Sequence, residues 1–166
     1  MRKTLAVVAG IVLLAVVNWT IYARERPLAE GEAVVLELAP VDPRSLMQGD
    51  YMALRFAVAN EAFSPNALEQ SEARNGHIVV APDQDGVARF VRHDTGGPLA
   101  AGERRLRYRV RAGEVKFATN AWFFQEGRAA DYENARYGEF RVAPSGEMLL
   151  VAMLGPELER LGSPPL

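Results

Sequence analysis

Hydrophobic and polar residues alternate along several short stretches of this chain, which is the pattern of half-buried β-strands. In the clearest stretch, residues 104–111, Leu106, Tyr108 and Val110 share one face and arginines occupy the other. Alternation or short apolar runs predict further strands at residues 34–39, 51–59, 77–81, 87–93, 137–142 and 148–154. Turn residues at 82–86 and 144–147 predict that the last four of these pair as two hairpins.

Short helices are predicted between the strands. Ser64 and Pro65 form a helix start and Gly76 a stop, so residues 65–74 should be a surface helix. Residues 129–135 have helix-forming composition, and residues 156–161 should form a last helical turn. The apolar stretch 115–124 should supply core mass through its aromatic residues Phe117, Trp122, Phe123 and Phe124. The predicted fold is therefore mainly β, a β-sandwich or open barrel with two or three short helices.

The N-terminus carries a different pattern, a charge-free run from Thr4 to Ala23 between Arg2-Lys3 and Arg24. Twenty residues at the helical rise span about 30 Å, the thickness of a bilayer's hydrocarbon core. We therefore expect a single transmembrane helix, with residues 4–23 in the lipid bilayer. The predicted organisation is an anchor at 1–23, a stalk at 24–31, a globular domain at 32–162 and a disordered tail at 163–166.

A cleaved secretory signal is the alternative, because residues 5–17 could serve as its apolar region. Trp19 and Tyr22 near the end of the run, followed by Arg24 and Arg26, favour an uncleaved anchor. The positive charges around the free amino terminus place that end in the cytoplasm. The expected location is the inner (cytoplasmic) membrane, single-pass, with the C-terminal domain periplasmic or extracellular.

Composition narrows the possible chemistry. The chain has no cysteine, which excludes disulfides, thiolate metal sites and cysteine nucleophiles. Two of its 19 Lys and Arg residues precede the apolar run, so 17 cations face 21 acids beyond it, a net charge of about −4. This balance argues against nucleic acid as a partner. Phosphate-binding glycine loops and metal-type His/Glu spacings do not occur, so we expect no cofactor and no metal.

The most distinctive local motif is Gly49-Asp50-Tyr51-Met52-Ala53-Leu54-Arg55-Phe56. It combines a turn glycine, an acid that can bond nearby backbone amides and an aromatic residue that opens a strand. Here the chain resembles the bacterial GDYXXLXY family, which is named after that motif. The resemblance extends to residues 42–46, 123–127, 135–142 and 146–154.

The resemblance implies a membrane-anchored domain of unknown function that often occurs beside polytopic membrane proteins. It implies no reaction, no cofactor and no catalytic residue. Phe56 replaces the family's final tyrosine, which makes a packing role at this position more plausible than a hydroxyl role.

The candidate binding residues are Asp50, Tyr51, Glu126, Arg136 and Tyr137. One interpretation is structural, with Asp50 capping its turn and Glu126 paired with Arg136. A second places the five side chains in one cleft as a ligand or partner site. A third uses Asp50 and Glu126 as an acid/base pair, which requires the two carboxyls to be close together and one pKa to be raised.

Other groups of residues also have more than one interpretation. Ser45 and Lys116 could form a nucleophile and base only if they lie close together. The stripe of Arg105, Arg107, Arg109 and Arg111 should pair with acids on neighbouring strands, or else contact an anionic surface. If residue 82 lies opposite residue 87 in the first hairpin, His77 lies opposite Arg92 and His93 points to the other face of the sheet. This placement argues against a metal shared by the two histidines.

These observations together predict a non-catalytic binding or accessory module for an integral membrane or envelope protein, with a polytopic membrane protein as partner. The alternative is a membrane-tethered hydrolase that uses carboxylates near Asp50 and Glu126. Whether the chain is an enzyme is left open, with binding favoured.

Overall fold

The chain is mainly β, as the alternating pattern predicts. The computed structural model describes residues 10–19, 31–39, 47–48, 51–64 and 74–162. Its strands are β1 (Glu32–Glu37), β2 (Met47–Gln48), β3 (Tyr51–Ala53), β4 (Arg74–Pro82), β5 (Ala88–His93), β6 (Arg104–Arg111), β7 (Glu114–Lys116), β8 (Ala121–Phe123), β9 (Tyr137–Val142) and β10 (Met148–Leu154). Helix α3 (Ala57–Ala62) and the 3-10 helix η1 (Ala129–Tyr132) lie between them.

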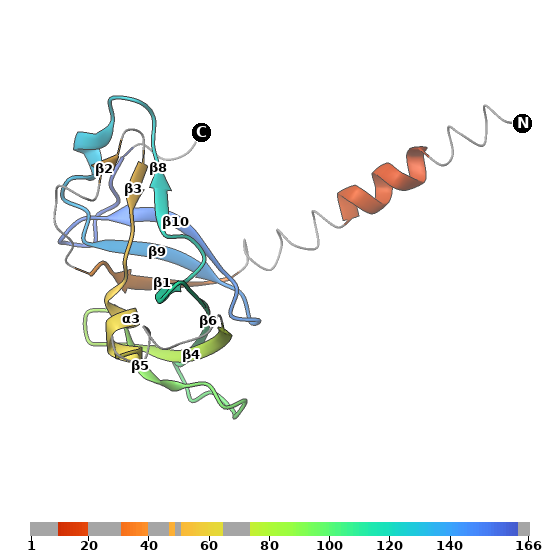
Figure 1. Ribbon diagram of the computed structural model, residues 1–166, viewed down its shortest axis with the longest axis horizontal. Helices are drawn as coiled ribbons and strands as arrows, with labels where there is room; N and C mark the ends of the chain where they lie inside the picture. The colour runs from red at the N-terminus through yellow and green to blue at the C-terminus, as the bar shows by residue number, and fades with distance from the viewer. Residues whose placement is uncertain (1–9, 20–30, 40–46, 49–50, 65–73, 163–166) are drawn as a thin grey trace, which may run out of the picture.

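The described strands form three small antiparallel sheets, seen one above the other in Figure 1. Their strand orders are β1-β9-β10, β2-β3-β8 and β5-β4-β6-β7. Both predicted hairpins, β4-β5 and β9-β10, are confirmed. Among the described strands, β8 and β10 each end their own sheet, and the outer edge of β10 is contacted at its far end, where Leu154 bridges to Arg160.

Single backbone contacts tie the sheets together. At the tip of the β9-β10 hairpin, the carbonyl of Gly146 accepts a hydrogen bond of 2.8 Å from the amide of Arg107 in β6. Isolated bridges join Leu38 to Phe56 and Val35 to Val87. Strand β1 therefore contacts segments of both other sheets, and the three sheets share one interior.

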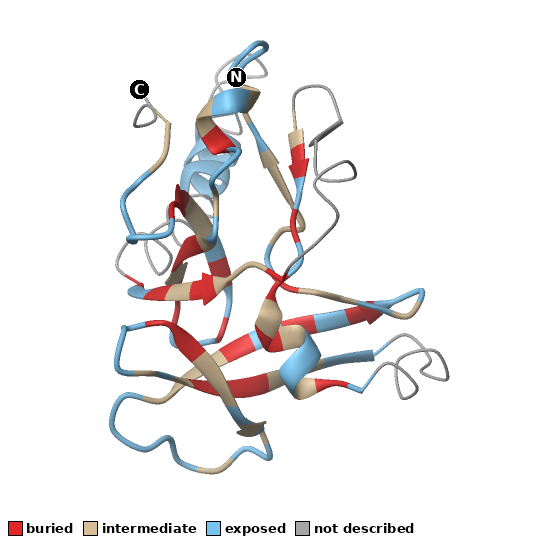
Figure 2. Cartoon of the chain, turned by 90° about the vertical axis from the view of Figure 1, so that its left-hand side faces the viewer, coloured by how far each residue is buried: buried red, intermediate tan, exposed pale blue. Residues whose placement is uncertain are grey.

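That interior is apolar and runs across all three sheets, as the buried strand segments in Figure 2 show. The predicted inward residues of β6, Leu106, Tyr108 and Val110, are all buried. Phe56 sits at the centre, with its ring edge-to-face to Phe117 at 6.0 Å and to Phe140 at 5.3 Å between ring centroids. Phe56 thus has the aromatic packing role that its position in the motif predicts.

Several local predictions are wrong. Residues 57–59 belong to α3 rather than to a strand, because a run rich in alanine favours helix once Phe56 has filled the core. Phe123 is exposed and supplies no core mass. Residues 156–161 form a turn that returns along β10, not a helix, and only 129–132 of the stretch 129–135 is helical. The predicted helix at 65–74 lies outside the described residues except for Arg74, which begins β4.

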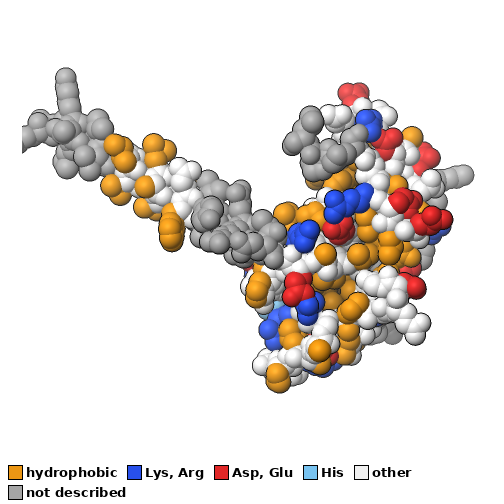
Figure 3. All heavy atoms as spheres, turned by 180° about the vertical axis from the view of Figure 1, so that it is seen from behind, with side chains coloured by type: hydrophobic (Ala, Val, Ile, Leu, Met, Phe, Trp, Pro, Cys, Tyr) orange, Lys and Arg blue, Asp and Glu red, His pale blue; other side chains and the backbone are white. Residues whose placement is uncertain are grey.

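The N-terminal run is described only at residues 10–19, which form a helix with every residue exposed. Within the described residues, no helix is both long enough and apolar enough to cross a membrane. The rest of the predicted anchor, the stalk up to residue 30 and the tail at 163–166 lie outside the described residues. In Figure 3 the helix shows mostly hydrophobic side chains, whereas acidic, basic and hydrophobic side chains mix on the visible face of the strands.

Candidate functional site

The structure describes four of the five candidate binding residues. Asp50 lies outside the described residues. Tyr51 opens β3 and lies opposite Phe123 of β8, with ring centroids 5.7 Å apart. Glu126 is exposed in the loop after β8, and Tyr137 opens β9, where it pairs with Glu37 and Leu154.

The predicted Glu126–Arg136 ion pair is wrong. No side-chain hydrogen bond or ion pair joins Glu126, Arg136 and Tyr137 in the described structure. Arg136 works through its backbone: its amide donates to the carbonyl of Leu154, and its carbonyl accepts from the amide of Leu38, both at 2.8 Å. Arg136 therefore closes one end of the β1-β9-β10 sheet, and its exposed side chain is not needed for that.

The other candidate groups also have structural explanations. Ser45 lies outside the described residues, and the ammonium of Lys116 lies 3.9 Å from the carboxylate of Glu114. The hairpin register differs by one residue or more from the predicted one, since β5 places His93 opposite Ile78, and the carbonyl of His77 accepts from the amide of Asp94. Among the residues that the structure describes, no cluster of three metal-ligating side chains occurs.

Three of the four stripe arginines are held by neighbouring groups. Arg105 donates to Asp94 at 2.6 and 3.3 Å, and the hydrogen bond from this guanidinium holds the pKa of Asp94 below its ordinary value. Arg107 donates to Glu147 at 3.1 Å, and Arg111 donates to the side-chain carbonyl of Asn75 at 3.0 Å. Asp94 directly follows β5 and Glu147 directly precedes β10, so the acid partners come from the ends of nearby strands.

Arg109 differs from its neighbours in the stripe. Its guanidinium makes no hydrogen bond or ion pair in the described part of the chain. It lines a hollow of about 250 Å³ together with Arg107, Phe117, Ala118, Glu147 and Met148. One cation on this face is therefore available to a ligand.

A second hollow adjoins the first. It has a volume of about 300 Å³ and lies between β8 and β10, which approach each other in Figure 1. Its walls are Ala121, Trp122 and Phe123 on one side and Met148, Leu149 and Leu150 on the other, with Ala118 and Thr119 at the end. Ala118 and Met148 line both hollows, so the two form one groove, which we call the β8-β10 groove.

The β8-β10 groove is largely apolar and open to solvent. Phe123 is 72% exposed and Leu149 is 48% exposed, one on each wall. Trp122 also lines the groove, and its buried indole Nε1–H has no hydrogen-bond partner among the described residues. Exposed apolar side chains that line a concave surface are typical of a binding site. The groove thus offers an apolar middle and the free guanidinium of Arg109 at one end.

A third hollow of about 290 Å³ lies beside the motif strand. Residues 53–56 line it together with Glu114, which is 3.6 Å from the guanidinium of Arg55, and Asn120. The side-chain carbonyl of Asn120 is buried without a hydrogen-bond partner. Because no second ligand-directed group accompanies it, this hollow is the weaker candidate.

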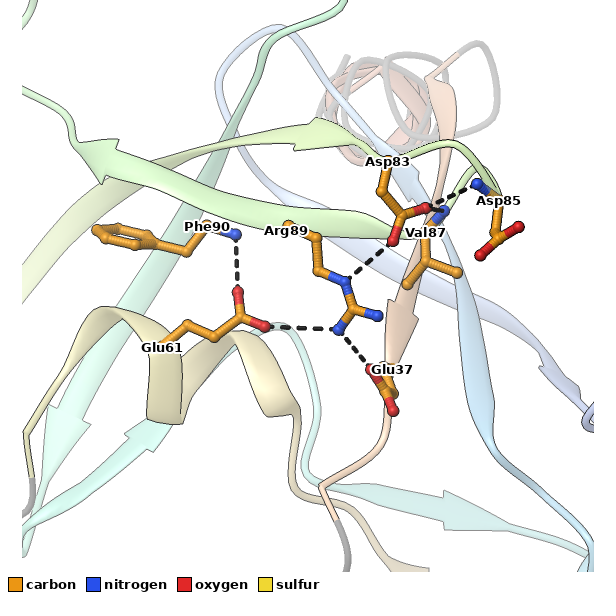
Figure 4. A network of polar contacts seen from close by, with 7 residues as sticks. All are labelled: Glu37, Glu61, Asp83, Asp85, Val87, Arg89 and Phe90. Carbon is orange, nitrogen blue, oxygen red and sulfur yellow. Dashed lines mark hydrogen bonds and ion pairs between the residues drawn. The ribbon is translucent and has the colours of Figure 1, made fainter.

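The most connected polar network in the described structure surrounds Arg89 and is structural. Figure 4 shows its guanidinium between the carboxylates of Glu37 in β1, Asp83 in the hairpin turn and Glu61 in α3. These contacts hold the pKa of Arg89 above its ordinary value, the hydrogen bond to Glu37 contributing most. Burial alone would raise the pKa of Asp83, but the hydrogen bonds from Arg89 and from two backbone amides lower it. The network joins β1, α3 and the β4-β5 turn through the Nε and Nη1 atoms of Arg89.

Comparison with known proteins agrees with the resemblance noted in the sequence. A family model described as GDYXXLXY protein matches residues 13–153, which is most of the chain. No curated protein and no solved structure matches the chain.

Proposed function

The chain belongs to the GDYXXLXY protein family, and from that premise we propose that it is a membrane-anchored accessory module. Its globular domain faces the extracytoplasmic side of the inner membrane and binds an integral membrane or envelope protein. It acts by binding and not by catalysis. The observation that carries this proposal is the β8-β10 groove, with its exposed apolar walls and the free guanidinium of Arg109.

Support for the membrane anchor comes from the helix of residues 10–19. Ile11 and Leu13 are 62% and 65% exposed, and Trp19 is 74% exposed. A helix that is apolar all round is stable in a lipid or protein environment and not in water. The charge-free sequence continues on both sides of this helix, from Thr4 to Ala23. A bilayer is the environment that suits a run of this length.

Support for binding comes from the electrostatics of the carboxylates. The described carboxyl groups with a shifted pKa are Asp83, Asp94 and Glu103, and each pKa is lowered by hydrogen bonds from arginine and backbone groups. A general acid near neutral pH needs a pKa raised toward neutrality. An apolar groove with one cation instead suits recognition of a partner's surface.

Two experiments test the proposal. Membranes that contain the full-length protein are washed with alkaline carbonate and with high salt. The protein should stay in the pellet, because a spanning helix inserts irreversibly whereas surface charge is screened. Full-length protein in the wash would refute the anchor.

The second experiment is crosslinking in native membranes with a photoreactive amino acid at position 123. It should give one main adduct with an integral membrane or envelope protein. A second groove probe is placed at position 149 and a control probe at position 91. If none of the three probes gives an adduct with another protein, the binding function is wrong. Position 91 serves as a control because Val91 is exposed but does not line the groove.

A further inference from the structure

One wall of the β8-β10 groove is an open strand edge. At the hairpin turn, the amide of Ala143 donates to the carbonyl of Glu147 at 2.8 Å. In an antiparallel pair, residues alternate between bonding the partner strand and facing away from it. Leu149 therefore bonds β9, whereas Met148 and Leu150 direct their amide and carbonyl groups toward the groove. Unpaired edge groups of this kind are a template for another strand.

The protein itself already uses the far end of this edge. The segment after β10 turns back and pairs antiparallel to it, with a bridge between Leu154 and Arg160. The amide of Leu161 donates to the carbonyl of Met153 at 2.9 Å. Arg160 fixes the segment by donating to both carboxylate oxygens of the buried Glu139, at 3.0 and 2.9 Å. The edge of β10 therefore accepts an antiparallel strand, and within the described residues this pairing involves Leu154 and Met153 and leaves Met148 and Leu150 unpaired on that edge.

The opposite wall has fewer open backbone groups. The amide of Leu54 donates to the carbonyl of Asn120 at 2.7 Å, so the same alternation turns the amide and carbonyl of Ala121 toward the groove. Both are already bonded to the hydroxyl of Thr119, at 3.1 and 2.8 Å. The alternation then leaves one outward amide and carbonyl on β8, those of Phe123, against two such residues on β10, Met148 and Leu150, so β10 supplies more of the open backbone and β8 supplies chiefly the side chain of Phe123.

The direction of pairing decides which end of a guest strand meets the cation. β10 runs from Met148 toward Leu154, so an antiparallel guest has its carboxyl-terminal end beside Met148. The hollow that contains Arg109 shares Met148. Since Arg107 is paired with Glu147, Arg109 is the guanidinium available to a carboxylate at that end.

From these contacts we propose that the β8-β10 groove binds an extended peptide segment of the partner protein by antiparallel strand addition to β10. Met148 and Leu150 bond its backbone, Phe123 and Leu149 contact its apolar side chains, and Arg109 binds a carboxylate at its carboxyl-terminal end. This inference rests on the proposed function and names the mode of that binding. Backbone bonds supply affinity in this mode, and the alternate side chains supply selectivity.

The test uses a synthetic peptide with alternating threonine and valine, a fluorescent N-terminus and a free carboxyl end. The full-length chain is held in lipid nanodiscs, and binding is read from fluorescence anisotropy. We expect saturable binding that weakens about tenfold or more when the carboxyl end is an amide, because one charged contact is lost. N-methylation of the alternate peptide amides that face β10 should abolish binding, whereas N-methylation of the amides between them should have little effect.

Variants of the protein assign the contacts. Arg109→Glu should weaken binding of the free-acid peptide at least about tenfold, and an amidated peptide ending in lysine should then bind better than the acid. Arg111→Glu is the matched control, since Arg111 lies on the same face of β6 but does not line the groove. Phe123→Ser should weaken both peptides equally, because it removes apolar contact and no charge.

Several results would overturn strand addition. Equal loss from N-methylation at both sets of amides would indicate mere apolar adsorption. Equal effects of Arg109→Glu and Arg111→Glu would remove Arg109 from the site. A competition experiment uses protein held in detergent and vesicles of phosphatidylethanolamine and phosphatidylglycerol. If the vesicles displace the peptide from the Phe123 wall, the groove is a lipid site. If photocrosslinks from a probe at position 149 to a membrane protein persist in Phe123→Ser at wild-type level, the accessory function stands and this mode of binding fails.

Discussion

Replacing Phe56 by alanine should destabilise the domain more than any change on its surface. The side chain is 2% exposed and has two edge-to-face aromatic neighbours, Phe117 and Phe140. Truncating a buried phenylalanine costs about 3–5 kcal/mol. Each lost aromatic pair contributes about 0.5–1.5 kcal/mol beyond burial. We therefore expect the free energy of unfolding to fall by about 4–5 kcal/mol, near the upper end of the range for a buried phenylalanine. For a domain of this size, we expect Tm to fall by about 15 °C.

Phe123→Ala is the matched control, because it removes the same ring from the exposed wall of the groove. Its one described aromatic contact is with Tyr51, so we expect a loss of less than about 1 kcal/mol. Urea unfolding of both variants, followed by circular dichroism, gives the two free energies. If Phe56→Ala does not fold, Phe56→Leu should still be clearly less stable than wild type. Equal destabilisation by the two alanine variants would refute the central role of Phe56.

Three more predictions follow from particular contacts. Gly146→Ala should cost more than Gly86→Ala in urea unfolding: both have positive φ, +83° and +81°, but only at Gly146 would a Cβ meet backbone, the carbonyl oxygen of Arg105 at 3.1 Å. Asp94→Asn should flatten the acid side of the stability profile. Arg105 lowers the folded-state pKa of Asp94 below 3.8, so its stabilisation is present above that value and is lost as pH falls through the folded pKa, which Tm at stepped pH will show. A chelator should leave Tm unchanged, and a fall would reveal a metal site.

The hairpins could be predicted from sequence because each depends on local signals. Residues 137–142 and 148–154 alternate or are apolar, and a proline-glycine turn separates them, so their pairing needs no distant contact. The same holds for β6, whose three inward residues are buried as predicted. In both cases the period of the pattern decides which face is buried, and the structure agrees.

The short elements could not be predicted because tertiary contacts decide them. Residues 51–59 alternate throughout, yet the chain leaves the sheet at residue 54 and turns into α3 at Ala57. Val58 is buried either way, so the pattern does not distinguish a strand from a helix here. Phe123 shows the converse: an aromatic residue beside core residues is exposed because β8 ends its sheet.

The groove itself was missed because its walls lie about 25 residues apart in the sequence and belong to different sheets. One signal was visible: four alternating arginines outnumber the acids near them, so one of the four was a candidate for a free cation. Which arginine is free depends on Asp94, Glu147 and Asn75, and only the folded chain brings those three to the strand.

The structure also changes how the family motif is understood. Met52, Leu54 and Phe56 are buried, and the register of β3 places Tyr51 opposite Phe123 and Met52 opposite Trp122. The motif strand therefore holds β8 in position, and β8 is one wall of the β8-β10 groove. Phe in place of the family's tyrosine preserves this arrangement, because the ring at position 56 acts through packing against Phe117 and Phe140. The motif therefore acts here as a core strand that positions one wall of the proposed binding groove.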